Sequence, residues 1–553
     1  MDLLDPTLLL AFLISIFILY LGLKSLWSHG NLPPGPTPLP LLGNALDIGL
    51  NYVNSLVKLS EKYGDVYTVY MGSRPVVIIT GYKRVKEIYF DKADDFLNRG
   101  AMPIWDDYYK NYGVGFTNNL ERWKDLRRFS LAAMRDFGFG KRTTEDRIQE
   151  EIPYLIEVFR ESNESFIDPR QSLFRALCNI VISILFGYRC EYEDEDMATV
   201  LSCIYEVFRT ASSPWGQIYE MFPGVMRYIP GPHQRFFKSF QKMEQYVRER
   251  VKINKKSLDP NNPRDFVDAF LIKMEKEKVN PNSEYTMKNL MASTIQIFFA
   301  GVATVSTTAT YSLLMLLKSP EVLEKVHKEI DQVIGRNRNP ILQDRNHMPY
   351  TDAVIHELQR FTDLAPIGGP RKTTKEVVLK GYTLPKNMDV IPMLTTVLKD
   401  PTCFKYPKEF NPENFLNAKG EFQRNPAFMP LAADVIFVVG LLLNVAMHMV
   451  IYRVHKNKKT CSLLQTLFCR SMNNFSDKQK VEKAEVREAL EQGKRVCIGE
   501  SLVGIELFLF LVAILQNFDL KSPVPLEELD IAPIVSGLGN FPKPYKVAFI
   551  PRL

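Results

Sequence analysis

The segment with the clearest chemical potential in this 553-residue chain is a glycine-flanked cysteine near the C-terminus. Residues 493–500 read Gly-Lys-Arg-Val-Cys-Ile-Gly-Glu, and an apolar run over residues 502–515 follows. The glycines let the backbone pass close to a large flat partner, and a helix that begins just after Cys497 would stabilise its thiolate. A thiolate without His or Cys companions nearby does not suit zinc, but it suits haem iron, where an axial thiolate favours O–O cleavage. The alternative is a small core cysteine beside a buried helix.

Two pairs of side chains at helical spacing add polar chemistry. Trp123 and Arg127 are four residues apart, so they share a helix face, and each could donate a hydrogen bond to a carboxylate such as a haem propionate. Glu357 and Arg360 are three residues apart in a predicted helix that begins near Thr351. The alternative for this second pair is an ordinary solvated ion pair.

A long apolar run over residues 287–317 predicts a central helix that is buried on all sides. Midway along it, residues 300–304 read Ala-Gly-Val-Ala-Thr. Gly301 would leave room for a small ligand, and Thr304 would offer a hydroxyl in an apolar wall. The alternative is that Thr304 and its Ser/Thr-rich neighbours bond back to helix carbonyls.

The elements that must position these residues are mostly helical. Residues 63–72 and 74–81 combine β-branched and aromatic residues with turn glycines and predict a hairpin. A helix is predicted to start at Ser319-Pro320, with serine as the N-cap. Residues 377–397 predict short strands and turns. The fold class is therefore mainly α (α+β), a large helical body with a small sheet at one end.

Composition excludes several classes of protein. Hydrophobic residues make up 46% and charged residues 24%, as in an ordinary globular protein, so disorder, collagen and coiled coil are excluded as the main class. A net charge of +6 is too mild to indicate a nucleic-acid partner. Seven cysteines argue against a disulfide scaffold and for a reducing compartment.

Two apolar segments point to a membrane. Residues 8–23 are apolar apart from one serine, follow an acidic start and precede Lys24, so residues 1–27 are predicted to form an uncleaved anchor helix with the body in the cytosol. The proline-rich residues 28–44 predict a stiff, extended spacer that holds the body off the bilayer. Residues 435–452 could also span a membrane, but the charges after them would then break the positive-inside bias. A buried core helix and a ligand for a proline-recognition module are the alternatives for the first two segments.

The order of these motifs resembles that of the cytochrome P450 haem-thiolate monooxygenases, within them the microsomal family 2 members. Residues 366–371 and 410–415 also look like the family's propionate-contacting turn and meander. The resemblance implies a cytochrome P450 fold over residues 45–433 and 493–553. It implies these roles: Cys497 as the iron ligand; Arg99, Trp123, Arg127, Arg371 and Arg495 on the propionates; Thr304 in handling dioxygen and protons; Glu357 and Arg360 as a structural network; and Phe116, Phe298 and Ala300 in the substrate pocket.

The resemblance also implies partners and a location. The family acts on small lipophilic substrates such as xenobiotics, fatty acids or steroids, with O₂, and takes electrons from NADPH through a flavoprotein reductase. The expected location is the endoplasmic reticulum membrane, with contacts to membrane lipid and the catalytic domain in the cytosol.

Four departures from the family pattern bear on activity. Ala303 stands where the family has an acid, Asn414 replaces a basic residue of the meander, and Gly504 replaces an arginine after the cysteine loop. The largest departure is that residues 434–492 split the haem loop, whose front half is Pro-Leu-Ala-Ala at residues 430–433. This insertion is a gene-prediction artefact or retained intron, a loop that leaves a working enzyme, or an inactivating interruption.

The leading hypothesis is therefore an anchored haem-dependent monooxygenase. One alternative is a catalytically dead or haem-deficient membrane protein, because the insertion emerges beside the thiolate and rigid surroundings are needed there. Another alternative is a haem-thiolate isomerase that does not activate O₂, because Ala303 removes the usual proton relay.

Overall fold

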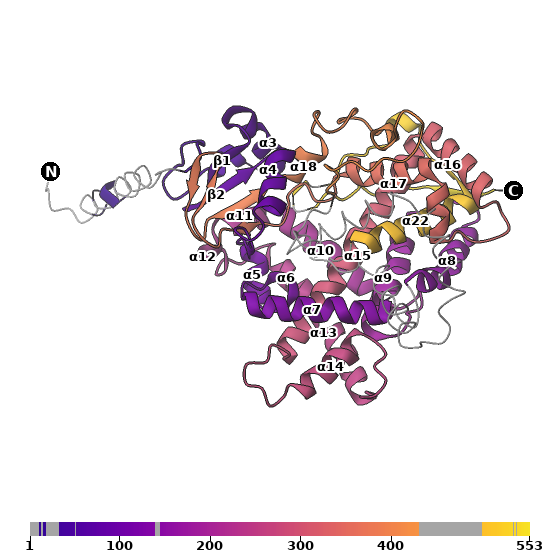
Figure 1. Ribbon diagram of the computed structural model, residues 1–553, viewed down its shortest axis with the longest axis horizontal. Helices are drawn as coiled ribbons and strands as arrows, with labels where there is room; N and C mark the ends of the chain where they lie inside the picture. Colours follow the sequence, from indigo (N-terminus) through magenta and orange to yellow (C-terminus); the bar gives the residue numbers. More distant parts are fainter. Residues whose placement is uncertain are drawn as a thin grey trace, which may run out of the picture.

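The computed structural model shows a large helical body with a small sheet at one end (Figure 1). It describes residues 32–49, 51–138, 144–430, 500–534, 536–537 and 539–552, together with Leu10, Phe12 and residues 15–17. The predicted anchor over residues 1–27 lies almost wholly outside the described residues, and so does the insertion over residues 434–492.

The main sheet has five strands in the order β1-β2-β7-β4-β3. The strands are β1 (Val66–Met71), β2 (Arg74–Ile79), β3 (Asn98–Arg99), β4 (Arg371–Lys372) and β7 (Asp389–Pro392). β1 and β2 form the predicted hairpin, and β7 joins β2 in parallel. Separate two-stranded sheets pair β5 (Val377–Leu379) with β6 (Tyr382–Leu384) and β8 (Phe518–Lys521) with β9 (Ala548–Pro551).

Helices make up the rest of the regular structure. They are α2 (Ala45–Ile48), α3 (Tyr52–Tyr63), α4 (Tyr82–Lys86), α5 (Pro103–Tyr109), α6 (Gly113–Phe116), α7 (Leu120–Gly138), α8 (Thr144–Glu161), α9 (Arg170–Phe186), α10 (Glu195–Ser212), α11 (Pro214–Met221), α12 (Pro223–Met226), α13 (Gln234–Lys256), α14 (Phe266–Lys276), α15 (Met287–Lys318), α16 (Pro320–Val333), α17 (Pro349–Thr362), α18 (Leu394–Leu398) and α22 (Glu500–Asn517). Shorter turns of helix are η1 (Glu87–Asp91), η2 (Leu342–His347), η3 (Pro412–Phe415) and η5 (Leu526–Glu528).

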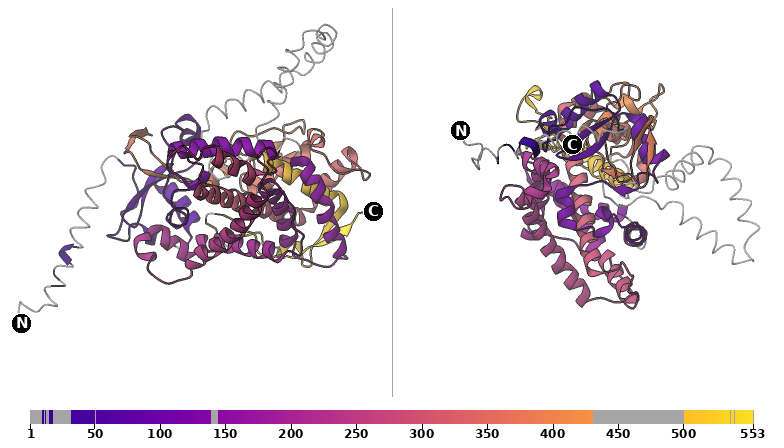
Figure 2. Two further views of the ribbon diagram at one scale, coloured as in Figure 1. Left: turned by 90° about the horizontal axis from the view of Figure 1, so that it is seen from below. Right: turned by 90° about the vertical axis from the view of Figure 1, so that its left-hand side faces the viewer.

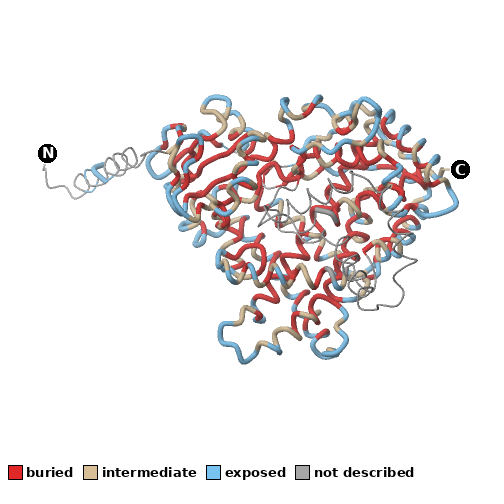
Figure 3. Tube along the Cα trace, viewed as in Figure 1, coloured by how far each residue is buried: buried red, intermediate tan, exposed pale blue. Residues whose placement is uncertain are grey.

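The predicted central helix is confirmed as α15, which runs through the helical body. It contacts α6, α9, α13, α17 and α22, and nearly all of its residues are buried (Figure 3). Among the described residues, α15 is the one helix long and apolar enough to cross a membrane, but 94% of its apolar window is buried inside the protein. Its hydrophobicity is therefore that of a core helix.

The proline-rich segment lies against the sheet along its described part, which begins at Leu32. The Pro34 carbonyl accepts a hydrogen bond from Thr68 N in β1 (2.9 Å), and Asn44 Nδ2 donates to the Pro36 carbonyl (3.2 Å). A side chain at Gly35 would overlap the Thr68 backbone. From Leu32 onward the segment is docked on the body, and residues 39–43 form a turn with Leu41 at a φ of +63°, so this part is not extended. The spacer role stays a prediction.

One local prediction is confirmed and one needs correction. Ser319 is the N-cap of α16 and Pro320 its first residue, as predicted, although the Ser319 side chain makes no capping hydrogen bond. Residues 377–397 contain the predicted short strands, but the chain then turns into α18. The sheet β8–β9 lies at the opposite end of the body from β1 and β2 (Figures 1 and 2).

Candidate active site

The middle of α15 presents a buried hydroxyl to the interior. Thr304 Oγ1 donates to the Ala300 carbonyl (3.0 Å), one turn earlier. Ser306, Thr308 and their hydroxyl neighbours bond back in the same way, with Thr308 Oγ1 donating to the Thr304 carbonyl (2.8 Å). The Thr304 oxygen keeps lone pairs with which it can accept a hydrogen bond, but it must release Ala300 before it can donate one.

Gly301 serves helix packing and not the ligand binding that its sequence position indicates. A side chain there would bring its Cβ within 3.1 Å of Val181 Cγ2 in α9. The glycine therefore permits close packing of α15 on α9, and the space beside it is filled by protein. The expectation that Gly301 leaves room for a ligand is not supported.

An aromatic wall surrounds the N-terminal side of this region. The ring of Phe299 lies 4.8 Å from that of Phe208, 5.4 Å from that of Phe240 and 5.6 Å from that of Trp105. Phe116, a predicted pocket residue, stacks on Trp105 with ring centroids 5.4 Å apart. Four helices, α5, α6, α10 and α13, thus bring rings to one face of α15.

Phe298 does not join this wall. Its ring packs on Tyr246 (5.9 Å) and Phe186 (6.3 Å) in the core between α9, α13 and α15. Successive residues in a helix turn by about 100°, so Phe298 lies roughly 200° around the helix from Ala300. The structure therefore separates these two predicted pocket residues, and Phe299 stands in the wall instead.

Gln296, a buried glutamine that no sequence motif indicated, fixes the aromatic wall to α15. Gln296 Oε1 accepts from Gly115 N (2.8 Å), and Gln296 Nε2 donates to the Tyr112 carbonyl (3.0 Å). Gly113 adopts a φ of +83° and donates its N–H to Asn289 Oδ1 (3.1 Å). These bonds hold α6, and with it Phe116, against the central helix.

Two buried arginines face each other at the edge of the sheet. Arg99 in β3 is the register partner of Arg371 in β4, and both side chains are buried. Arg99 Nε and Nη2 donate to the Gly115 carbonyl (3.1 and 2.8 Å), which joins this edge to α6. The two strands therefore place two cationic side chains at one edge of the sheet.

Trp123 and Arg127 come to the same region from α7. The Arg127 guanidinium stacks on the indole with its Cζ 5.7 Å from the ring, and Trp123 is buried. Asn118, just before α7, accepts a hydrogen bond from Arg99 N (2.7 Å), so the start of α7 is tied to β3. Arginine and indole N–H groups are the donor types that the carboxylates of a haem accept, so the propionate-binding roles of these residues stay a prediction.

The Glu357–Arg360 pair is a buried structural network. Both side chains are 0% exposed, and Arg360 Nε and Nη2 donate to the two Glu357 oxygens at 2.7 Å each. Arg360 also donates to the carbonyls of Leu398, Pro407, Tyr406 and Glu409. Asn414 Nδ2 donates to Glu357 (3.2 and 3.3 Å), so the neutral residue still supports the network. The solvated alternative for this pair is wrong.

The thiolate half of the predicted site lies outside the described residues, because Cys497 and Arg495 fall before Glu500. The helix that follows them, α22, packs on α8, α15, α16 and α17. Gly504 in this helix faces Arg345, whose Nη1 is 3.3 Å from the position of an added Cβ.

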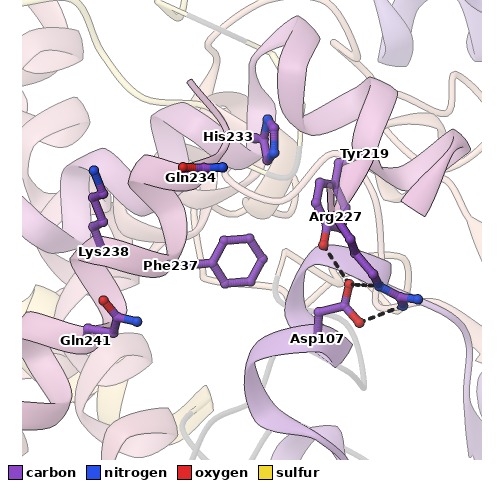
Figure 4. A pocket seen from close by; sticks show the side chains of 8 residues that line it. All are labelled: Asp107, Tyr219, Arg227, His233, Gln234, Phe237, Lys238 and Gln241. Carbon is purple, nitrogen blue, oxygen red and sulfur yellow. Dashed lines mark hydrogen bonds and ion pairs between the residues drawn. The ribbon is translucent and has the colours of Figure 1, made fainter. Parts of the chain in front are cut away.

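A surface hollow of about 480 Å³ is lined by residues of α5, α11 and α13 and by Arg227, which directly follows α12 (Figure 4). Two of its charged groups, Asp107 and Arg227, are paired with each other. Asp107 accepts from Tyr219 Oη (2.6 Å) and from Arg227 Nε and Nη2 (2.7 and 2.6 Å). We interpret this triad as a clamp that fixes α5 to α11 and α12.

A mainly helical fold with buried cationic donors and an apolar wall on its central helix suits a haem-binding oxidoreductase. The sequence pattern described as Cytochrome P450 matches residues 33–433 and 491–549, and the chain belongs to this family of haem-dependent monooxygenases. This confirms the predicted fold class, enzyme class and cofactor. The match ends at residue 433, directly before the predicted insertion, and resumes at residue 491, so it includes the last two residues of that insertion.

The chain is similar over nearly its whole length to mammalian family 2 proteins. It is 42% identical to Cytochrome P450 2G1 of Oryctolagus cuniculus over 547 residues, covering 99% of both chains. It is 43% identical to Cytochrome P450 2A5 of Mus musculus over 541 residues, covering 97% of both. It is 42% identical to Cytochrome P450 2A13 of Homo sapiens over 535 residues, covering 96% of both.

Proposed function

We propose that the chain is a membrane-anchored monooxygenase that inserts one atom of O₂ into a small lipophilic substrate. Its electrons come from NADPH through a flavoprotein reductase, and its catalytic body lies on the cytosolic side of the endoplasmic reticulum. The observation that carries this proposal is the family pattern over residues 33–433 and 491–549, which takes in the buried Arg99 and Arg371 and the apolar wall of α15. The wall suits a lipophilic ligand.

The cofactor would be held by this chain's own side chains. Arg99, Arg371, Trp123 and Arg127 would donate to the two haem carboxylates, with Arg495 as a further donor. When bound through the Cys497 thiolate, haem supplies the iron chemistry that activates dioxygen. Donors that are already buried and stacked lose little freedom on binding, so they favour a fixed cofactor orientation.

Thr304 would handle protons without an acidic neighbour. Its hydroxyl bonds to the Ala300 carbonyl, and Ala303, buried beside it, offers no carboxylate. Proton delivery therefore depends on Thr304 exchanging its helix bond for one to water. We expect slower proton delivery than in a chain with an acid at this position.

The aromatic wall would select substrates by shape and exclude water. Rings such as Phe299, Phe208 and Trp105 provide no fixed charge and little polar surface. Burial of apolar substrate surface against them drives binding at about 25 cal/mol per Å² of apolar surface. Drug-like, steroid and fatty-acid molecules all satisfy this requirement.

The test is the carbon monoxide difference spectrum of the dithionite-reduced, full-length protein in lipid nanodiscs. We expect the red-shifted Soret band of thiolate ligation. Replacing Cys497 with Ser should abolish that band, whereas Cys403→Ser, at a partly exposed thiol, should keep it. An imidazole-type band, or protein that carries no haem, would overturn the proposal.

Two other functions have specific support. The insertion at residues 434–492 favours a haem-deficient membrane protein, which haem content of the purified chain would reveal. Ala303 favours a haem-thiolate isomerase that rearranges a peroxide. NADPH-dependent O₂ uptake in the presence of the reductase would argue against the isomerase.

A further inference from the structure

A small recess of about 60 Å³ lies where the end of α10 and the start of α11 meet the main sheet. Most of its lining is apolar, as in ligand sites. A few polar side chains converge on it. The lining residues that matter here are Tyr52, Arg74, Ala211, Ser212, Gln217 and Glu220.

Two buried polar groups of the recess have no partner among the described residues. Ser212 is 3% exposed and Gln217 is 9% exposed, yet Ser212 Oγ and Gln217 Oε1 make no hydrogen bond. The other end of the Gln217 amide is occupied, because Nε2 donates to the Ser212 carbonyl (3.2 Å). This bond fixes the amide, so Oε1 remains an acceptor without a donor. Leaving such groups unpaired is costly.

The remaining polar groups are engaged or uncharged. Arg74 Nη1 pairs with Asp389 Oδ2 (2.7 Å), and Tyr52 Oη contacts Met71 Sδ (3.9 Å). Loss of hydration raises the pKa of Glu220 to about 8, although part of the residue remains accessible, and its Oε1 accepts the Ile104 N–H (3.2 Å). At neutral pH the recess therefore favours an uncharged group on its ligand.

The recess adjoins the proposed substrate wall. Ala211 follows Phe208 by three residues in α10, a rise of about 4.5 Å along the helix, and Phe208 stacks on Phe299. A side chain at Gly537 would bring its Cβ within 3.0 Å of Ser212 Oγ, so the backbone closes over this group. The volume accommodates one or two water-sized groups.

We propose that this recess binds the hydroxyl group of a lipophilic substrate whose apolar part lies along the aromatic wall. The hydroxyl donates to Gln217 Oε1 and accepts from the Ser212 hydroxyl, so both unpaired groups gain a partner. This inference rests on the proposed function and assigns a substrate class to it: lipophilic alcohols.

The test is calorimetric binding to the full-length protein in nanodiscs, which needs no turnover. The probes are 6-phenylhexan-1-ol, hexylbenzene and 6-phenylhexan-1-amine. Two neutral hydrogen bonds should raise the affinity ratio of alcohol to hydrocarbon about tenfold over that of the Ser212→Ala, Gln217→Met double variant. Ser130→Ala, which removes another buried hydroxyl without a partner in the described chain, should leave the ratio unchanged.

Three results would overturn the inference. They are an unchanged ratio in the double variant, an equal loss in Ser130→Ala, and amine binding tighter than alcohol binding, which would point to pairing with the Glu220 carboxylate. The carbon monoxide spectrum is recorded on the same samples. A thiolate band without the alcohol preference would refute the recess alone, whereas the preference without haem would refute the monooxygenase alone.

Discussion

Glu506 is fully buried in α22, and neither carboxylate oxygen has a hydrogen-bond partner among the described residues. Burial raises its pKa well above the ordinary value of 4.5. Gly504 stands two residues earlier, where the family has arginine, and the nearby Arg345 is committed to Asp352 (2.6 Å). Gly504 brings no charge to this helix, and burial favours the protonated form of the Glu506 carboxyl group.

This protonation gives a pH-dependent stability. Above about pH 4.5 the unfolded chain releases the Glu506 proton while the folded chain retains it, so stability falls as pH rises toward the folded pKa. Glu506→Gln cannot ionise and should flatten this fall, so it should gain stability over the parent at pH 8 relative to pH 5. Urea unfolding at both values measures the effect, and exposed Glu528→Gln is the control. If the free energy of unfolding of the parent and of Glu506→Gln changed with pH in parallel, this prediction would be contradicted.

At the scale of elements, one arginine joins α17 to the irregular chain before η3. Arg360 holds Glu357 within α17 and reaches four backbone carbonyls between Leu398 and Glu409. These carbonyls belong to a segment with little regular structure, so the guanidinium supplies hydrogen bonds that a sheet or helix would otherwise provide.

Removing that guanidinium should therefore be severe. Arg360→Met leaves Glu357 as an uncompensated buried charge, and we expect a loss of about 3–5 kcal/mol in the free energy of unfolding. Lys328→Met breaks the Glu324 pair, in which both side chains are 66% exposed, and should change stability by less than about 1 kcal/mol. Chemical denaturation measures the free energy of unfolding of both variants. Equal losses of unfolding free energy in the two variants would mean that the buried Glu357–Arg360 network stabilises the fold no more than an exposed ion pair does.

Sequence periodicity predicted elements better than contacts between them. The hairpin β1–β2 and the buried helix α15 follow from local pattern, because alternation and all-round apolarity are properties of one segment. The direction of Phe298 and the packing role of Gly301 depend on α9 and α13, which the pattern of α15 does not contain. The recess at Ser212 and Gln217 was missed for the same reason, since a helix corner meets strands far away in the sequence.

For the whole molecule, the central question is how the halves of the haem loop relate. The family pattern ends at residue 433, resumes at 491 and covers both flanks. The described parts on either side pack together, because α22 contacts α15 and α17. The described flanks on the two sides of residues 434–492 therefore belong to one packed body.

Deleting residues 434–492 should accordingly restore a continuous loop, with Ala433 joined to Gly493. We expect the deletion variant to bind about one haem per chain and to give a stronger thiolate band per mole than the parent, because the ligand geometry depends on the rigidity of its surroundings. Alcohol binding in the recess, far along the chain from the junction, reports whether the body has folded. A folded deletion variant with no gain in haem would show that the insertion does not limit cofactor binding. A parent that already holds full haem would show that the chain tolerates the insertion.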